Sequence, residues 1–297
     1  MSPPVPYAPA GRFLRERFGG PIFRIVVDAG FSCPNRDATL GTQGCAFCNV
    51  DGFRPPTSRP QLSISEQIAR PLPYLRRRHP GAVGYLVYFQ PYTNTYGPAS
   101  RLAAAVEEAL AGEGARGVIV GTRPDCLADD VLDLLVDLNA RTFLQVELGV
   151  QSTRDRVLRE MGRGHRWRTS RVAIGRLRRR GIRVGAHMIL GTPWESAASE
   201  ARGARLLSQA GIDAVKIHQL QVLQNTPLAR QEDLELPTWR EYAERVAGFL
   251  AALDDRIIIE RLVARTRPDL LIAPRWGVDP ARVREEIVRR LRGRRDR

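Results

Sequence analysis

A chain of 297 residues can form one large α/β domain or two smaller domains, and 43% hydrophobic residues are enough for a sizeable core. The sequence contains no stretch of 18 or more apolar residues and no hydrophobic signal-peptide core, which excludes a membrane-spanning helix and predicts a cytoplasmic protein without a membrane partner. Four cysteines are too few for a disulfide scaffold in a chain of this length.

The formal net charge of +14 favours a polyanionic partner such as RNA. Lys216 is the single lysine, so a bias toward arginine explains the choice of cation but not the excess over acids. Arginines cluster at 76–78, 176–180 and 289–297. A solvated face near a helix end is the alternative interpretation of the first two clusters, and the last is a basic tail, either disordered or in contact with nucleic acid.

Residues 1–20 are rich in proline and glycine and are expected to lead into a first strand at 21–28. The loop after this strand carries Cys33, Cys45 and Cys48 in the spacing C-x11-C-x2-C. Three thiolates from one loop suit an iron–sulfur cluster, and a four-iron cluster on three cysteines keeps one iron without a protein ligand. The loop is therefore a candidate metal centre with an open iron.

Two alternatives remain for this loop. A structural zinc site needs a fourth cysteine or histidine, and Cys126 and the four histidines lie far away in the sequence. A set of buried free thiols is the other alternative.

The segments Asp28–Asp37 (DAGFSCPNRD) and Gly44–Asn49 (GCAFCN) resemble the cluster loop of radical S-adenosylmethionine (SAM) proteins. The match is to the YhcC-like branch, which is related to the radical SAM half of the Elp3 tRNA-modifying enzymes. Most of the superfamily uses C-x3-C-x2-C, whereas this branch has the longer spacing and an aromatic residue before the last cysteine, here Phe47. The resemblance implies Cys33, Cys45 and Cys48 as ligands of a [4Fe-4S] cluster.

The same resemblance implies that the open iron chelates SAM and that Phe47 is a cofactor-binding residue. An electron from the cluster would break the S–C5′ bond of SAM and give a 5′-deoxyadenosyl radical. The cofactors supply this chemistry and the protein supplies position and shelter. An electron donor such as flavodoxin or ferredoxin is an implied partner.

Beyond the loop, Ser63 and Glu66 form a capping box that predicts a helix over 64–78, kinked or split by Pro71 and Pro73. Strands and helices then alternate, which implies parallel βαβ units and one continuous sheet. The further strands are predicted at 83–90, 117–121, 142–149, 183–190 and 213–218.

Two more helix starts are predicted from capping signals. Ser152 with Asp155 is one, and Thr192-Pro193-Trp194-Glu195 supplies an N-cap, a first-turn proline and a capping-box acid.

The fold class is α/β, and the resemblance closes the sheet into a partial (β/α)6 TIM-like barrel of the radical SAM type with a small C-terminal extension. The predicted core spans 21–220, and 221–297 is expected to pack on it and to shape the substrate pocket. This extension should contain a helix capped by Thr238 and Glu241, a short strand at 257–260 and a terminal helix at 283–291. In an open sheet or a barrel, the active site belongs at the carboxyl ends of the strands.

Polar residues follow these strand ends. Thr93 and Asn94 occupy the place where many radical SAM proteins bind the methionine amino group, although such residues also suit an ordinary turn. Arg123 can hold an anionic group of SAM or substrate, or pair with Asp125 to cap the next helix. Cys126 is either a radical relay or a structural thiol.

Glu147 lies between apolar residues of a buried strand, where a carboxylate needs a partner. In the radical SAM proteins that this segment resembles, the corresponding acid contacts SAM near its ribose or amino group, and the resemblance implies the same role for Glu147. Arg163, between two glycines that permit close backbone approach, resembles the arginine that pairs with the SAM carboxylate.

His187 and Leu190 lie in a strand that resembles the adenine-binding segment, and we interpret both as cofactor-binding residues, with a satisfied core histidine as the alternative for His187. Lys216 and His218 share one face of the sixth strand by its period-two alternation. Both are candidate catalytic residues for proton transfer or substrate binding.

The sequence thus predicts a radical SAM enzyme that abstracts hydrogen from a substrate, with RNA or tRNA as the first substrate hypothesis. The rival hypothesis is a non-catalytic module in which a structural zinc ion supports RNA binding.

Overall fold

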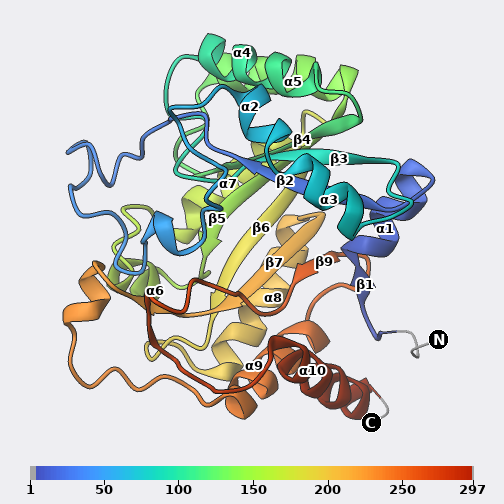
Figure 1. The fold of residues 1–297 in the computed structure, drawn as a ribbon. Coiled ribbons are helices and arrows are strands. Elements are labelled where there is room, and N and C mark those ends of the chain that lie inside the picture. The colour runs from blue at the N-terminus through green and yellow to red at the C-terminus, as the bar shows by residue number, and fades with distance from the viewer. Residues whose placement is uncertain (1–4, 296–297) are drawn as a thin grey trace.

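Eight strands pair in one sheet, in the order β1-β9-β7-β6-β5-β4-β3-β2, and every pairing in it is parallel. The computed structural model describes residues 5–295, and Figure 1 shows helices on the outside of the curved sheet. The strands of this sheet are β1 (Ala8–Pro9), β2 (Ile22–Val27), β3 (Gly84–Phe89), β4 (Ala115–Thr122), β5 (Phe143–Gln151), β6 (Arg183–Leu190), β7 (Ala214–Gln219) and β9 (Ile258–Arg261).

The central strands are buried on both faces, which is why they read as nearly continuous apolar runs. Every residue of β3 is buried, and in β4 the last six residues are. The outer helices contribute apolar stripes to the same core, such as Val131, Leu135 and Leu138 of α5. The helices are α1 (Ala10–Phe18), α2 (Ile64–Ala69), α3 (Leu72–Arg78), α4 (Ala99–Leu110), α5 (Asp129–Arg141), α6 (Asp155–Glu160), α7 (Trp167–Arg178), α8 (Ala197–Ala210), α9 (Trp239–Ala251) and α10 (Pro280–Arg295), with short 3-10 helices η1 (Val50–Gly52) and η2 (Pro227–Arg230).

The partial barrel is confirmed, and it is wider than the six strands expected. β9 pairs with β7, and β1 extends the sheet beyond β9. The sheet curls so far that Arg24 of β2 reaches Glu260 of β9, with 2.9 Å between Nη1 and Oε2, although five strands separate β2 from β9 in the sheet order. The charged pair spans the interior of the barrel.

Several local predictions are confirmed. Ser63 and Thr238 each form a capping box with the glutamate three residues later. The helix predicted over 64–78 is split into α2 and α3 at the prolines.

Two of the predicted helix starts are wrong. The helix start predicted at Thr192 is replaced by Ser196, which caps α8 by accepting a hydrogen bond from the Ser199 N–H. Thr192 to Glu195 instead form a turn before the helix, in which the Glu195 N–H donates to the Thr192 carbonyl. α6 has no side-chain cap. The Oγ of Ser152 instead accepts from the backbone of Arg154 in the loop before this helix.

The termini are more ordered than the sequence patterns indicated. The lead-in supplies β1 and α1, and residues 1–4 lie outside the described part of the chain. In the basic tail, Arg289, Arg290, Arg294 and Arg295 belong to α10 and pair with acids, so the disordered alternative is wrong as far as residue 295. Residues 296–297 of that prediction fall outside the description.

Residues of the C-terminal part lie at the carboxyl ends of the strands, where they line a cavity, among them Gln221, Leu223, Ala264 and Arg265. β8 (Val222–Leu223) and β10 (Leu271–Ala273) pair antiparallel, and α9 packs against both α8 and α10. The boundary at residue 220 remains a prediction, since β9 from beyond it is part of the main sheet. Over residues 5–295, none of the helices has the length and apolarity needed to span a bilayer.

Candidate functional site

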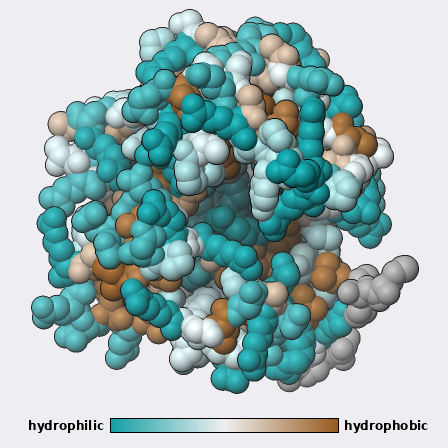
Figure 2. Space-filling view, in the orientation of Figure 1, coloured by the Kyte–Doolittle hydropathy of each residue, from teal (hydrophilic) through white to brown (hydrophobic). Residues whose placement is uncertain are grey.

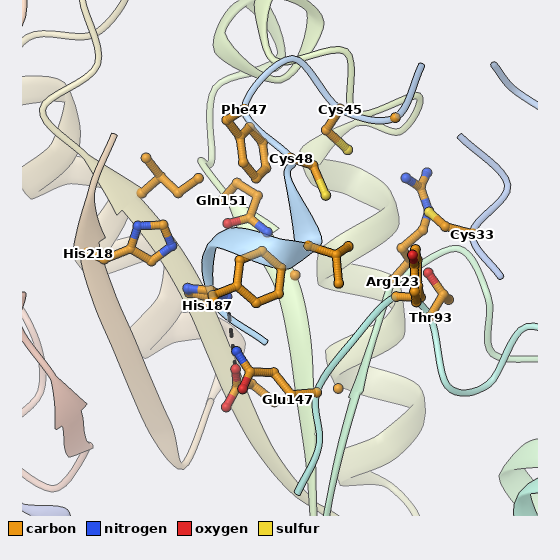
Figure 3. Close-up of a pocket in the computed structure, with 18 of the residues that line it drawn as sticks. Cys33, Cys45, Phe47, Cys48, Thr93, Arg123, Glu147, Gln151, His187 and His218 are labelled. Carbon is orange, nitrogen blue, oxygen red and sulfur yellow. Dashed lines mark ion pairs between the residues drawn. The ribbon is translucent and has the colours of Figure 1, made fainter. Parts of the chain in front are cut away.

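A cavity opens at the carboxyl ends of the strands, and Figure 2 shows it as a hollow lined mostly by hydrophilic side chains. The three cysteines of the loop line it, together with residues from most strands of the sheet and from the C-terminal part. In Figure 3 the cysteines lie toward one side of this cavity, and Glu147, His187 and His218 lie toward the other. The lining also includes Arg36, Phe47, Tyr88, Thr93, Arg123, Gln151, Arg163, Ile189, Arg261 and Arg265.

Distant segments fix the shape of the cysteine loop. The N–H of Arg36 donates to the Cys33 carbonyl at 2.8 Å, and the N–H of Cys48 to the Cys45 carbonyl at 2.9 Å. Ala46, between the last two cysteines, donates to the Met161 carbonyl at 2.9 Å and accepts from the Leu228 N–H at 3.0 Å. The loop is therefore clamped between the end of α6 and η2.

Hydrogen-bond donors point at the sulfur atoms. Cys45 Sγ accepts from Asn35 Nδ2 and from Arg163 Nη1, both at 3.1 Å, and Arg36 Nη2 lies 3.6 Å from Cys48 Sγ. Burial opposes ionisation of the Cys45 thiol, but Arg163 and Asn35 outweigh it and lower its pKa. Burial, and then the neighbouring Cys45, raises the pKa of Cys48.

This donor set fits an iron–sulfur cluster, because such clusters are held by thiolates and hydrogen bonds to the sulfurs tune them. A single zinc ion instead draws its ligands to within about 2.3 Å of one point. Within residues 5–295, no group of three His, Cys, Asp or Glu side chains is arranged to hold one metal ion.

Arg163 reaches the loop because glycines bend the chain on both sides of it. Gly162 and Gly164 have φ values of +62° and +70°, in the left-handed region that suits glycine. Arg163 Nη2 donates to the Gly149 carbonyl at 2.6 Å, and its buried Nε has no hydrogen-bond partner in the described chain. A hydrogen-bond acceptor bound beside the cysteines would satisfy this free N–H of Arg163.

The pairing of Arg123 with Asp125 is confirmed, and the predicted capping role is not. The guanidinium binds both carboxylate oxygens, at 2.9 Å and 2.7 Å, and also donates to the Arg163 carbonyl at 2.7 Å. α5 starts after Ala128 without a side-chain cap. Burial opposes ionisation of Asp125, but Arg123 outweighs it and lowers the pKa.

Cys126 is half-buried and is not among the residues that line the cavity. Burial, and then Asp125, raises the pKa of its thiol to about 12.

Thr93 and Asn94 have different surroundings. Thr93 lines the cavity, and its buried Oγ1 lacks a partner among the described residues. Asn94 is buried below the lining, where its Nδ2 donates to the carbonyls of Phe89, Pro91 and Gly121 at 2.9 to 3.1 Å. Asn94 therefore holds the turn, and Thr93 offers a free hydroxyl to a ligand.

Glu147 has two hydrogen-bond partners in the described part of the chain, and His187 Nδ1 lies 3.9 Å from its Oε1. Tyr88 donates its hydroxyl to Glu147 Oε1 at 2.6 Å, and Lys216 Nζ donates to Oε2. Lys216 also lies 3.0 Å from the Tyr88 hydroxyl, so the three side chains form a closed set. Burial lowers the pKa of Lys216 despite the nearby acids, and burial with Glu147 raises the pKa of Tyr88 well above its usual value.

Lys216 and His218, predicted to share a face, meet different environments. Lys216 lies beneath Glu147 and does not line the cavity, whereas His218 does. Lys216 also approaches Glu260 to 3.8 Å, and Glu260 accepts from Gln145 at 2.6 Å and from Arg24. A ladder of buried charged and polar groups thus runs from the cavity into the barrel.

His187 and His218 lie side by side at the cavity wall, with ring centroids 4.5 Å apart. The Nδ1 of His218 lies 2.8 Å from the Gln219 carbonyl, and the buried Nε2 of His187 has no described partner. Burial lowers the pKa of both rings, that of His218 to about 3, with further lowering of each by Arg261. Both histidines are therefore neutral near pH 7.

The two apolar residues predicted to bind cofactor also lie apart. Phe47 lines the cavity beside the cysteines, whereas Leu190 is buried in the main core and is not part of the lining.

Tyr88, Arg24, Glu260 and Arg261 were not singled out from the sequence. A signal for the charged ones was present, since Arg24 interrupts the apolar run of β2, and Glu260 and Arg261 end a run of isoleucines. Charges at such positions need partners inside the fold.

Comparison with known proteins identifies the family of this chain. Residues 39–200 match the family model of the radical SAM superfamily, and residues 212–293 match the radical SAM C-terminal domain. The chain is 33% identical to YtqA of Bacillus subtilis over 95% of its own length and 88% of that protein. It is also 33% identical to YhcC of Escherichia coli K12, over 90% of this chain and 86% of that protein.

Solved structures share the fold at low sequence identity. The archaeal Elp3 of Methanocaldococcus infernus superposes with a TM-score of 0.69 at 17% identity, over 93% of this chain and 64% of that one. Streptococcus suis SuiB, solved with S-adenosylmethionine, superposes with a TM-score of 0.53 at 11% identity, over 85% of this chain and 53% of that one. The chain therefore belongs to the radical SAM superfamily, in the branch that contains YhcC and YtqA, and is a radical SAM enzyme with a [4Fe-4S] cluster and S-adenosylmethionine as its cofactors.

Proposed function

We propose that Cys33, Cys45 and Cys48 hold the cluster and that the enzyme abstracts hydrogen from a substrate bound on the opposite side of the same cavity. The observation that carries this proposal is the convergence of the three cysteines and the donors to their sulfurs on one cavity at the strand ends. When bound, the cluster and SAM supply the reducing electron and the organic radical chemistry.

SAM is proposed to lie beside the cysteines, where the free groups suit it. The unpartnered Nε of Arg163 can donate to the SAM carboxylate, and the unpartnered Oγ1 of Thr93 can accept from its amino group. Phe47 covers this part of the cavity with an apolar ring. Each of these groups positions the cofactor without a change in its own protonation state.

Glu147 and His187, which the resemblance assigns to SAM, lie with His218 away from the cysteines, and we assign these three to the substrate side. Lys216 holds Glu147 from below and is a positioning residue in this proposal. The two neutral histidines can accept a proton from a substrate that loses one during the reaction.

The family needs an electron donor, for which flavodoxin or ferredoxin stays our proposal. RNA or tRNA as substrate stays a prediction from the resemblance to Elp3 and from the net charge. Some of the arginines are already paired with acids of the same chain, since those of α10 form ion pairs with Glu244, Glu286 and Asp255.

The test is anaerobic reconstitution of the full chain with iron and sulfide, followed by SAM and dithionite. We expect iron and sulfide in the ratio of a four-iron cluster and the release of 5′-deoxyadenosine. Cys45→Ala should abolish both, whereas Cys126→Ala, at the cysteine outside the cavity, should retain both. Zinc in place of iron, or deoxyadenosine from the Cys45→Ala protein, would contradict the proposal.

A further inference from the structure

Arg261, the last residue of β9, lines the cavity without a partner. No hydrogen bond or ion pair of its guanidinium occurs within the described part of the chain, and its Nε is buried. Arg261 as a whole is half-buried, so the observation that counts is the enclosed Nε: a buried N–H without an acceptor is costly and is normally matched by an anion or another hydrogen-bond acceptor.

The other cations of the lining are engaged. Arg123 is paired with Asp125, and Arg265 lies 3.5 Å from Asp279. Arg163 donates to Cys45 and to a backbone carbonyl, and Arg36 donates to the Cys48 carbonyl. Of the lining residues, Glu147 is the acid, and Lys216 and Tyr88 already occupy it. No described acid of the cavity is left to pair with Arg261.

The histidine pair is the neighbour of Arg261 in the sheet. Lys216 is the register partner of both His187 and Arg261, so these residues lie level on β6, β7 and β9. Arg261 is close enough to lower the pKa of both histidine rings. His187 Nε2 is a second buried polar atom without a hydrogen-bond partner among the described residues. Two orphaned groups at one level of the cavity wall indicate one missing ligand.

We propose that the substrate carries an anionic oxygen group, a carboxylate or a phosphate, which binds to Arg261 between the side chains of His187 and His218. This inference rests on the proposed function only in placing the substrate on this side of the cavity. Arg261 provides a forked donor that matches such groups in two-point geometry.

The surroundings also predict what happens to protons. His187 is faced by Glu147 from β5, by His218 and Lys216 from β7, by Arg261 from β9 and by Arg163 from the loop after α6. Burial is the main cause of the lowered pKa of both rings, and the positive charges around them, Arg261 among them, lower it further; an anion bound at Arg261 offsets part of this second cause. Binding should therefore be accompanied by proton uptake and become tighter as pH falls toward the pKa of the rings in the complex.

The experiment uses the full chain labelled with ¹³C at the imidazole Cε1, with and without the reconstituted cluster and with SAM at saturation. The chain has four histidines, so their signals can be assigned by His→Gln substitution. Sodium phosphate and sodium acetate are titrated separately, with chloride at equal ionic strength as the control. His79 is the internal reference, because it stacks on Phe23 and does not line the cavity.

We expect saturable shifts of the His187 and His218 signals with phosphate, acetate or both, and none at His79. A response to acetate alone identifies a carboxylate, and a response to phosphate alone identifies a phosphate. Arg261→Gln should weaken the affinity at least tenfold. Arg256→Gln, an identical change at an exposed ion pair outside the cavity, should leave it unchanged.

Three results would overturn the proposal: shifts that chloride reproduces, no saturable shift in the wild-type chain, or loss of the shifts when SAM is added, which would assign Arg261 to SAM. The wild-type titration decides the matter even if a variant misfolds. Failure of the proposed function shows separately, as missing deoxyadenosine in a chain that still binds the anion.

Discussion

Arg163 Nη1 lies 3.1 Å from the Sγ of Cys45, a residue 118 positions earlier in the chain. The same guanidinium donates to the Gly149 carbonyl at the end of β5, so it connects the cysteine loop to the sheet. One side chain thus positions a proposed cluster ligand and presents a free Nε to the proposed site of SAM.

Arg163→Lys should weaken SAM binding. A lysine keeps the charge but lacks the planar fork, so it cannot serve Cys45, the Gly149 carbonyl and a carboxylate together. We expect the Kd for SAM to rise about tenfold, equivalent to about 1.4 kcal/mol, as measured by equilibrium dialysis on the reconstituted enzyme. Arg159→Lys on nearby α6 is the matched control, and equal SAM affinity in both variants would contradict the assignment.

Lys216→Met should destabilise the fold strongly. The substitution removes the ammonium group that pairs with Glu147 and lies 3.8 Å from Glu260. Both carboxylates then stay buried without this cation, and breaking a buried ion pair in this way typically costs about 3 to 5 kcal/mol of folding free energy. Urea unfolding measures the effect. Arg12→Met, which breaks the exposed pair of Arg12 with Glu16, should change stability little.

The double variant Glu147→Gln with Lys216→Met should be less destabilised than the sum of the single changes, by about 1 to 3 kcal/mol. Additive effects would mean that the two groups do not depend on each other.

Glu200 should make stability fall as pH rises. Burial raises the pKa of this carboxyl to about 7, although Arg245 and the Gly191 N–H oppose the shift. Between the ordinary value of 4.5 and about 7, the folded state therefore holds a proton that the unfolded state has lost. Protonation stabilises the fold at low pH, and this contribution disappears as pH rises through the folded pKa.

The test compares the wild type with Glu200→Gln, which imitates the protonated acid. The free energy of unfolding of the wild type should fall relative to that of the variant by roughly 2 to 3 kcal/mol between about pH 5 and about pH 8. A constant difference across this range would refute the shifted pKa. Glu66→Gln is no substitute as a control, because Glu66 completes the capping box of α2; Glu235→Gln, in an exposed loop, serves instead.

The sequence predicted what short-range patterns encode. The apolar run 183–190 is β6, and the prolines at 71 and 73 divide the helix because they lack the N–H that a continuous helix needs. The cysteine loop was found because its three thiols are close along the chain. Such features depend on neighbours within about a dozen residues.

What the sequence could not predict depends on register between strands. Glu147 was expected to need a partner, yet Tyr88 and Lys216 lie 59 and 69 residues away and meet it only because β3, β5 and β7 face one interior. Period-two alternation predicts that Lys216 and His218 share one face of the strand, but it does not predict how deep each residue lies in the barrel. That depth decides that His218 lines the cavity and Lys216 does not. The sequence likewise could not predict that Arg261 lacks a hydrogen-bond partner among the described residues, because this depends on the positions of all the residues around it.

The clamping of the cysteine loop has a consequence for biosynthesis. Its backbone is held by Met161, by Leu228 and, at Gly52, by Arg267, which is synthesised more than two hundred residues after the first of the three cysteines. While the nascent chain is still short, the thiols therefore lack the contacts that shape their loop. We therefore expect the loop to take the shape that its three cysteines need only after most of the chain has been synthesised.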